Sequence, residues 1–250
     1  MVLAAARPGR GVSPRNPGRG VSPRNPGRGV SPRKTVPNLS VEQACFEAGD
    51  ALVCGIDEVG RGAWAGPVTV GAVVVSSDLP RIVKVRDSKV LTLEEREALY
   101  PRIIRWALAY AVGHASAAEC DALGMTAALR LAAERALATL DGIKPDRIIL
   151  DGNHDYLGQP DRVRTVVDGD ALCLSVAAAS VVAKVTRDRM MAAEAGCYPG
   201  FDFDSNRGYP SPRHKCALLG YGPTAIHRRS WIYMENLPWA LAPVNQGNLF

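Results

Sequence analysis

Runs of apolar residues predict several buried strands after residue 50. Residues 52–56 read as a short buried strand, and residues 68–75, rich in β-branched side chains, read as a second strand antiparallel to the first. Residues 147–152 and 164–170 are two further apolar runs, each with an acid at its end. Together these runs predict a mixed β-sheet in which the first two strands pair antiparallel.

Helical spacing of apolar residues predicts helices between these strands. One begins at Thr92, because a threonine followed three residues later by Glu95 forms a capping box, and it runs to about Trp106. Others cover about residues 126–140 and 175–195, and short helices follow towards the C-terminus. The pattern predicts an α/β fold, a mixed sheet flanked by helices with a small C-terminal helical region.

The first 36 residues differ in composition from the rest. The unit PGRGVSPRN begins at Pro8 and Pro17, and PGRGVSPRK begins at Pro26. So much proline and glycine, with so little apolar surface to bury, predicts a disordered basic tail. We interpret it as a dispensable repeat or sequence upstream of the true start, and alternatively as an electrostatic tether for nucleic acid. The repeated proline and glycine disfavour the amphipathic helix of a transit peptide.

The net charge of +5 is concentrated in this tail. Residues 1–34 hold eight of the 30 basic residues and none of the 25 acidic ones, which leaves 22 bases against 25 acids. A basic binding surface on the folded part must therefore be local. The six cysteines form no CxxC pair, which argues against a zinc site and favours reduced thiols. The apolar run 171–183 is shorter than the roughly 20 residues of a membrane span, so we expect no membrane association and a cytoplasmic protein.

Acidic residues stand at the ends of three predicted strands: Asp57 with Glu58, Asp151, and Asp170. A single acid there is commonly a turn or cap residue, but converging carboxylates repel one another unless cations bind between them. Oxygen ligands without histidine or cysteine favour Mg²⁺ or Mn²⁺, ions that activate water for phosphodiester hydrolysis. Adjacent strand residues face opposite sides, so Asp57 and Glu58 can share a site only where the strand frays or bulges.

The glycine-rich turn GRGAWAG, residues 60–66, is not a dinucleotide-binding loop, because a strand and not a helix follows it. Its glycines predict a close approach of backbone to a ligand.

Six motifs in this order resemble the bacterial ribonuclease HII family: GIDEVGRGAWAGPV, DSKVLT, ILDGN, GDALCLSVAAASVVAKVTRDR, NRGYPSPRH and HRRSW. The similarity covers about residues 53–238. It implies an RNase H-like fold with a mixed five-stranded sheet and a catalytic domain over residues 50–238. We also expect a flexible tail over residues 239–250 and a monomer. The resemblance also implies an endonuclease that hydrolyses the RNA strand of RNA–DNA hybrids and cuts 5′ to single ribonucleotides in duplex DNA, leaving a 3′-OH and a 5′-phosphate.

The resemblance assigns roles to individual residues. The family's metal-binding carboxylates match Asp57, Glu58, Asp151 and Asp170. The 2′-OH of the ribonucleotide would be contacted by Gly60, Arg61 and Gly62, and the next deoxyribose would stack on Tyr209. Backbone phosphates would be held by Ser88, Lys89, Lys184 and Arg187.

Other interpretations of some residues stay open at this stage. Lys184 and Arg187 share a helix face and could pair with Asp188, and Tyr209 could be an ordinary turn aromatic. A surface role is as plausible as a nucleic-acid contact for His214, His227, Arg228 and Arg229, and packing is the simplest role of Trp64 and Trp106.

The chain departs from the family at Asp168, where a basic residue is usual; the Gly-Asp dipeptide favours Asp170 as the ligand. The C-terminal QGNLF resembles short peptides that dock on sliding clamps, with chance similarity as the alternative. The rival functions are a structure-specific DNA nuclease of the same fold, such as a junction resolvase, and a basic-tailed RNA-binding protein with structural carboxylates.

Overall fold

A computed structural model of the chain describes residues 36–80, 82 and 84–238. These residues form a mixed five-stranded sheet in the order β3-β2-β1-β4-β5, which confirms the predicted fold class. Strands β1 and β2 pair antiparallel, as predicted, and so do β2 and β3, whereas β4 and β5 join in parallel. The strands are β1 (Leu52–Val59), β2 (Val68–Ser76), β3 (Ala109–Ala115), β4 (Arg147–Asp151) and β5 (Val163–Val166).

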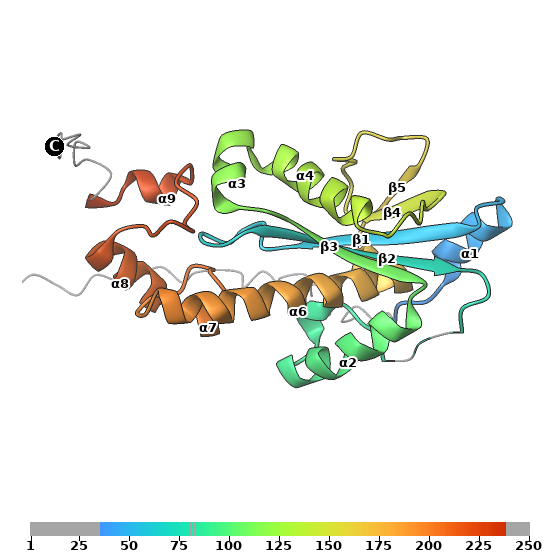
Figure 1. Cartoon of the computed structure of the whole chain (residues 1–250), viewed down its shortest axis with the longest axis horizontal. Helices are drawn as coiled ribbons and strands as arrows, with labels where there is room; N and C mark the ends of the chain where they lie inside the picture. Colours follow the sequence, from blue (N-terminus) through green and yellow to red (C-terminus); the bar gives the residue numbers. More distant parts are fainter. Residues whose placement is uncertain (1–35, 81, 83, 239–250) are drawn as a thin grey trace, which may run out of the picture. The chain divides into compact units, whose positions relative to one another are not determined.

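Helices cover both faces of the sheet (Figure 1). Helix α4 packs on β2 and β3, and the long helix α6 packs on β1 and β2 from the other side, with α2 against α6. The helices before the C-terminal region are α1 (Ser40–Glu47), the 3₁₀ turn η1 (Ser88–Val90), α2 (Leu93–Trp106), α3 (Ala117–Leu123), α4 (Met125–Ala138), α5 (Gly169–Leu172) and α6 (Leu174–Cys197).

Glycines bring α6 close to the sheet. A Cβ at Gly55 would lie 2.3 Å from the carbonyl carbon of Ser175, and one at Gly71 would lie 2.4 Å from the carbonyl oxygen of Ala179. Since Asp57 stands opposite Gly71 in the sheet, this close approach sets the spacing between Asp57 and α6.

The Thr92–Glu95 capping box is present and α2 ends at Trp106, as predicted. The predicted end of the strand over residues 164–170 was wrong, because β5 stops at Val166 and the short helix α5 follows it. Strand β3, at the edge of the sheet, was not predicted.

Helix α1 precedes residue 50, where the folded part was expected to begin. Its Glu42 is fully buried and accepts hydrogen bonds from the backbone N and the Oγ of Ser175, at 2.8 and 2.7 Å. Ser175 lies in the first turn of α6, where backbone N–H groups lack helical partners. Glu42 therefore caps α6 from a different helix.

The C-terminal helices α7 (Phe203–Asn206), α8 (Pro212–Tyr221) and α9 (Ile232–Glu235) surround a separate small core that includes Phe201, Phe203 and Met191. Among the described residues, no helix is both long and apolar enough to span a bilayer. The expectations of a disordered tail over residues 1–36 and of a flexible C-terminal tail with QGNLF fall outside the described part of the chain, Val36 excepted.

Candidate active site

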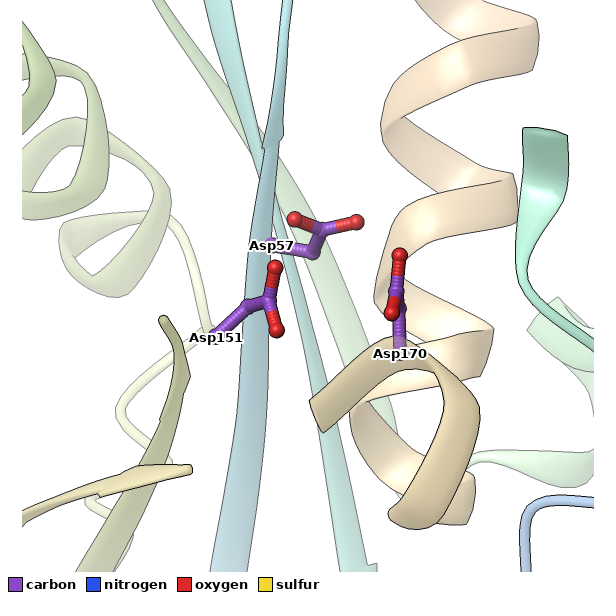
Figure 2. A group of neighbouring side chains, drawn as sticks. All are labelled: Asp57, Asp151 and Asp170. Atoms are coloured by element: carbon purple, nitrogen blue, oxygen red, sulfur yellow. The ribbon is translucent and has the colours of Figure 1, made fainter. Parts of the chain in front are cut away.

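Three carboxylates from separate elements meet beside β1. Asp57 lies on β1, Asp151 ends β4 and Asp170 lies on α5, and each offers an oxygen within 4.8 Å of the others. Figure 2 shows these side chains around a common space. The Asp151 Oδ1 accepts a hydrogen bond of 2.7 Å from the Gly169 backbone N, which ties α5 to the end of β4.

Burial makes this cluster costly without a counter-charge. Burial raises the pKa of Asp57 well above its usual value, and the charges of Glu58 and Asp151 add to the effect. Burial also raises the pKa of Asp151, with a further contribution from Asp170. Both carboxyl groups therefore favour protonation unless positive charge is brought between them.

Glu58 is not part of this three-carboxylate cluster. Strand β1 stays paired with β2 through Val59, so Asp57 and Glu58 face opposite sides of the sheet. Glu58 lines a neighbouring cavity of about 240 Å³ together with Asp151 and Tyr156. Burial raises the pKa of Glu58, and Asp151 contributes to that rise. Asp151 thus lies between the cluster and Glu58, so Glu58 borders the site from the α4 side.

The residues of the DSK motif support the cluster in different ways. Lys89 Nζ lies 2.9 Å from Asp170 Oδ2, and the Lys89 side chain is 70% exposed. Ser88 is buried, and its Oγ accepts a hydrogen bond of 2.7 Å from Ser180 Oγ on α6. The Ser180 hydroxyl also lies beside Asp57 and lowers the pKa of Asp57. Ser88 thus contacts Ser180 beside Asp57, and its expected phosphate contact stays a prediction.

The glycine turn after β1 lies against Tyr209. The Gly60 backbone N donates a hydrogen bond of 3.1 Å to the Tyr209 hydroxyl, and Gly62 lies at the edge of the same ring. Gly60 has a φ of 85°, a conformation that favours glycine. Arg61 is exposed, with Nη1 3.6 Å from Glu58 Oε1. The structure therefore brings the residues expected to recognise a ribonucleotide together, directly beside the carboxylates.

Arg187, for which a phosphate contact was expected, contacts backbone carbonyl groups in the structure, and the phosphate contact stays a prediction. Arg187 is fully buried, and its three guanidinium nitrogens donate to the carbonyl oxygens of Pro67, Arg207 and Ala65. A Cβ at Gly60 would lie 2.2 Å from Arg187 Nε, so the guanidinium packs directly beneath the turn. Arg187 is therefore a structural support of the glycine turn.

A second buried arginine supports the other end of that turn. Arg228 is fully buried, and its side chain donates to the carbonyl oxygens of Arg61 and Gly66. The sequence left a surface role and a nucleic-acid contact open for Arg228, and the burial of Arg228 excludes the surface role. His214 and His227 are buried as well, which excludes the surface role left open for them. The HRRSW motif contributed to the family resemblance, but it did not indicate that the side chains of His227 and Arg228 are buried.

Lys184 is part of a group of charges around the buried Asp188. Its Nζ lies 2.7 Å from Asp188 Oδ1, while Arg96 and Arg207 each approach Asp188 Oδ2 at 3.9 Å. The pairing of Lys184 with Asp188, left open from the sequence, is present. Three cations around one carboxylate leave an excess of positive charge at this position.

The extra acid Asp168 is exposed and has a φ of 55°, ahead of α5, whereas Asp170 is buried within the cluster. Asp170 is thus the carboxylate that joins the other two, as the Gly-Asp dipeptide favoured. Trp64 stacks on Tyr233 with ring centroids 3.9 Å apart, consistent with a packing role.

The donor set fits a divalent cation. Three carboxylates with converging oxygens, two of them with raised pKa values, offer hard anionic ligands whose mutual repulsion a cation would relieve. Neither histidine nor cysteine belongs to this cluster, as suits magnesium or manganese better than zinc.

The sequence matches the family model described as Ribonuclease HII over residues 54–234. Ribonuclease HII of Streptomyces coelicolor is 56% identical over 190 residues, which cover 76% of this chain and 81% of that protein. Ribonuclease HII of Ruegeria sp. is 46% identical over 196 residues, covering 78% and 84% of the two chains.

Solved structures show the same similarity. The crystal structure of ribonuclease H2 from Pyrococcus horikoshii matches with a TM-score of 0.62 and 32% identity, over 74% of this chain and 95% of that one. Ribonuclease HII from Archaeoglobus fulgidus, solved in complex with PCNA, matches with a TM-score of 0.60 and 28% identity, over 72% and 95%.

Proposed function

This chain belongs to the ribonuclease HII family, endonucleases that hydrolyse the RNA of RNA–DNA hybrids, and we propose that it also cuts duplex DNA on the 5′ side of a single ribonucleotide. One observation carries this proposal. The turn that begins at Gly60 starts two residues beyond Glu58, so the groups suited to recognising a ribose adjoin the carboxylates suited to hydrolysis. The products would be a 3′-OH and a 5′-phosphate.

Asp57, Asp151 and Asp170 would hold the divalent cation, with Glu58 bordering the site from the neighbouring cavity. A bound Mg²⁺ or Mn²⁺ supplies Lewis-acid chemistry, stabilising charge on the phosphate and making water more acidic. The chain's own contribution is to fix these carboxylates: Gly169 orients Asp151, and the Ser88–Ser180 pair supports Asp57.

Recognition of the ribonucleotide would fall to Gly60, Arg61 and Gly62. The 2′-OH is the group that distinguishes RNA from DNA at one position, and a glycine turn lets the backbone approach it closely. Tyr209 bonds to this turn through its hydroxyl, which leaves its ring as the surface for the following deoxyribose. A nuclease specific for DNA junctions would not need these groups.

Lys89 and Lys184 would hold backbone phosphates. Lys89 is largely exposed beside Asp170, and Lys184 belongs to the cationic group around Asp188. Contacts of this kind position the duplex without reading its sequence.

A sliding clamp is the proposed partner of the C-terminal residues 246–250. The ribonuclease HII of Archaeoglobus fulgidus was solved in complex with PCNA, which supports a clamp as partner within the family. Surface plasmon resonance of the full chain over the immobilised bacterial clamp should show binding that is lost when residues 246–250 are removed. Equal binding by the truncated chain would refute the assignment.

Cleavage of a DNA duplex with one ribonucleotide tests the proposed activity. With Mg²⁺ or Mn²⁺, we expect a single cut 5′ to the ribonucleotide, and end-group mapping should find a 3′-OH and a 5′-phosphate. EDTA should abolish the cut. Cleavage of long RNA–DNA hybrids alone, without a cut at the single ribonucleotide, would rule out the proposed role of the glycine turn and Tyr209.

A further inference from the structure

His214 and His227 form a buried pair that the proposed function does not use. Their Nε2 atoms lie 2.9 Å apart, between α8 and the segment that precedes α9. The rings of Phe201 and Phe203 pack around them, with the Phe203 centroid 5.3 Å from that of His214. The aromatic surroundings favour neutral imidazoles.

The partners of the pair fix where each proton lies. His227 Nδ1 lies 2.9 Å from the Thr224 backbone N, which can only donate, so this nitrogen is an acceptor and carries no proton. His214 Nδ1 lies 2.9 Å from the Tyr209 carbonyl oxygen, which can only accept, so this nitrogen carries a proton. The neutral rings then leave one arrangement, in which His227 Nε2–H donates to the bare His214 Nε2.

Protonation of either ring would break this arrangement. A second proton on His214 would place hydrogens on both facing Nε2 atoms. Burial lowers the pKa of His214, and burial together with the proximity of His214 and Arg229 lowers the pKa of His227 to about 3. The two rings thus remain neutral near neutral pH.

The hydrogen-bonded series ends at the proposed recognition groups. His214 holds the backbone of Tyr209, and the Tyr209 hydroxyl accepts from the Gly60 backbone N. The next residue after His227 is Arg228, whose side chain holds the carbonyl oxygens of Arg61 and Gly66. Two consecutive residues thus support both Tyr209 and the glycine turn.

We propose that His227 and His214 are positioning residues that hold Tyr209 against the glycine turn and thereby set the preference for a ribonucleotide followed by DNA. This inference rests on the proposed role of Tyr209 in recognition. Neither histidine contacts the carboxylate cluster in the hydrogen bonds described, so their effect is on selectivity rather than on hydrolysis.

Two substitutions at one position separate the two bonds of His214. In His214→Asn the amide nitrogen replaces Nδ1 as donor to the Tyr209 carbonyl, whereas in His214→Gln the terminal group replaces Nε2 and the donor to Tyr209 is lost. Steady-state cleavage is measured on two duplexes, with one ribonucleotide followed either by DNA or by further RNA. The readout is the ratio of the two kcat/KM values.

His214→Gln should reduce this ratio roughly fivefold to tenfold, the effect of one hydrogen bond, while His214→Asn should keep it. An unchanged ratio in His214→Gln would overturn the positioning role. A wild-type enzyme without any preference would overturn the proposed role of Tyr209, and the inference with it.

Nitrogen-15 NMR of the imidazoles in the wild-type protein tests the pair without relying on activity or on the folding of a variant. We expect a proton on Nδ1 of His214 and on Nε2 of His227. Nε2-protonated rings at both positions, or a cationic ring at neutral pH, would overturn the arrangement.

Discussion

Lys89 Nζ donates a hydrogen bond of 2.9 Å to Oδ2 of Asp170, so one carboxylate of the candidate metal site is already paired with a cation from the chain. Burial lowers the pKa of Lys89, but the hydrogen bond and charge of Asp170 outweigh it and raise the pKa overall. Lys89 is therefore charged and partly neutralises the cluster.

Replacing Lys89 by glutamine should increase the gain in melting temperature on adding Mg²⁺ or Mn²⁺. The variant loses the charge that stabilises the cation-free cluster, so a bound divalent ion relieves more repulsion. Differential scanning fluorimetry with and without the ion measures this gain. Lys184→Gln is the matched control, because Lys184 pairs with Asp188 outside the cluster. A smaller gain in Lys89→Gln than in the control would contradict the account.

Asp57→Asn should stabilise the protein in EDTA while abolishing cleavage. A raised pKa means that the folded state holds a proton more tightly than the unfolded state. The contribution of Asp57 to the unfolding free energy is therefore present below its ordinary pKa of 3.8 and is lost as the pH rises through the raised value.

At neutral pH the asparagine variant avoids this loss, so it should unfold at a higher urea concentration than the wild-type protein. Urea unfolding in EDTA at acidic and neutral pH measures the difference. If Asp57→Asn is less stable than the wild-type protein at neutral pH, the charged Asp57 carboxylate does not destabilise the cation-free protein, which contradicts this account.

Glu42→Ala should lower the unfolding free energy by about 1–3 kcal/mol, because the Ser175 backbone N and hydroxyl lose their shared acceptor at the start of α6. Glu42→Gln keeps an acceptor and is the control.

Burial raises the pKa of Glu42, so the wild-type carboxylate should contribute less to the unfolding free energy as the pH rises above its ordinary pKa of 4.5. Urea unfolding of the three proteins across that range should show a flatter pH dependence in the glutamine variant, and parallel curves would contradict the raised pKa of Glu42. An alanine variant as stable as the glutamine variant would refute the cap assignment.

Lys184 and Arg187 should differ in the salt dependence of substrate binding. Lys184→Ala should reduce the slope of log affinity against log salt by about 0.9, the value for one phosphate contact on duplex DNA. Arg187→Lys should lower the melting temperature, because three carbonyl oxygens lose a planar partner, but leave the slope unchanged. Fluorescence anisotropy over a salt series, in Ca²⁺ to prevent cleavage, distinguishes them. A slope reduced in Arg187→Lys would restore the phosphate role that its burial argues against.

Local patterns were sufficient for much of the fold and for the three carboxylates of the cluster. The capping box at Thr92 is read from two residues, and the carboxylates at the ends of β1 and β4 follow from short apolar runs. Strand alternation allowed Asp57 and Glu58 to share a site only where the strand frays or bulges, and β1 does neither, because it stays paired with β2 through Val59. Strand β3 was missed because its burial is interrupted: only Ala111, Gly113 and Ala115 are buried in AYAVGHA.

The buried polar residues could not be predicted from local sequence. Arg228 is stabilised by carbonyl oxygens more than 160 residues away, and Arg187 by oxygens about 120 residues away. Burial of a guanidinium is favourable only once such acceptors are assembled, and no local pattern reveals them. The same holds for His214 and His227, whose pairing depends on two separate C-terminal segments.

Cleavage of two DNA duplexes that differ only in one 2′-OH tests the central claim most directly. With Mg²⁺, the wild-type protein should cut the ribonucleotide-containing duplex on the 5′ side of that residue and leave the all-DNA duplex intact, and Asp57→Asn should cut neither. Cleavage of the all-DNA duplex, or full activity in Asp57→Asn, would contradict the assignment of the carboxylates to hydrolysis and of the glycine turn to recognition of the 2′-OH.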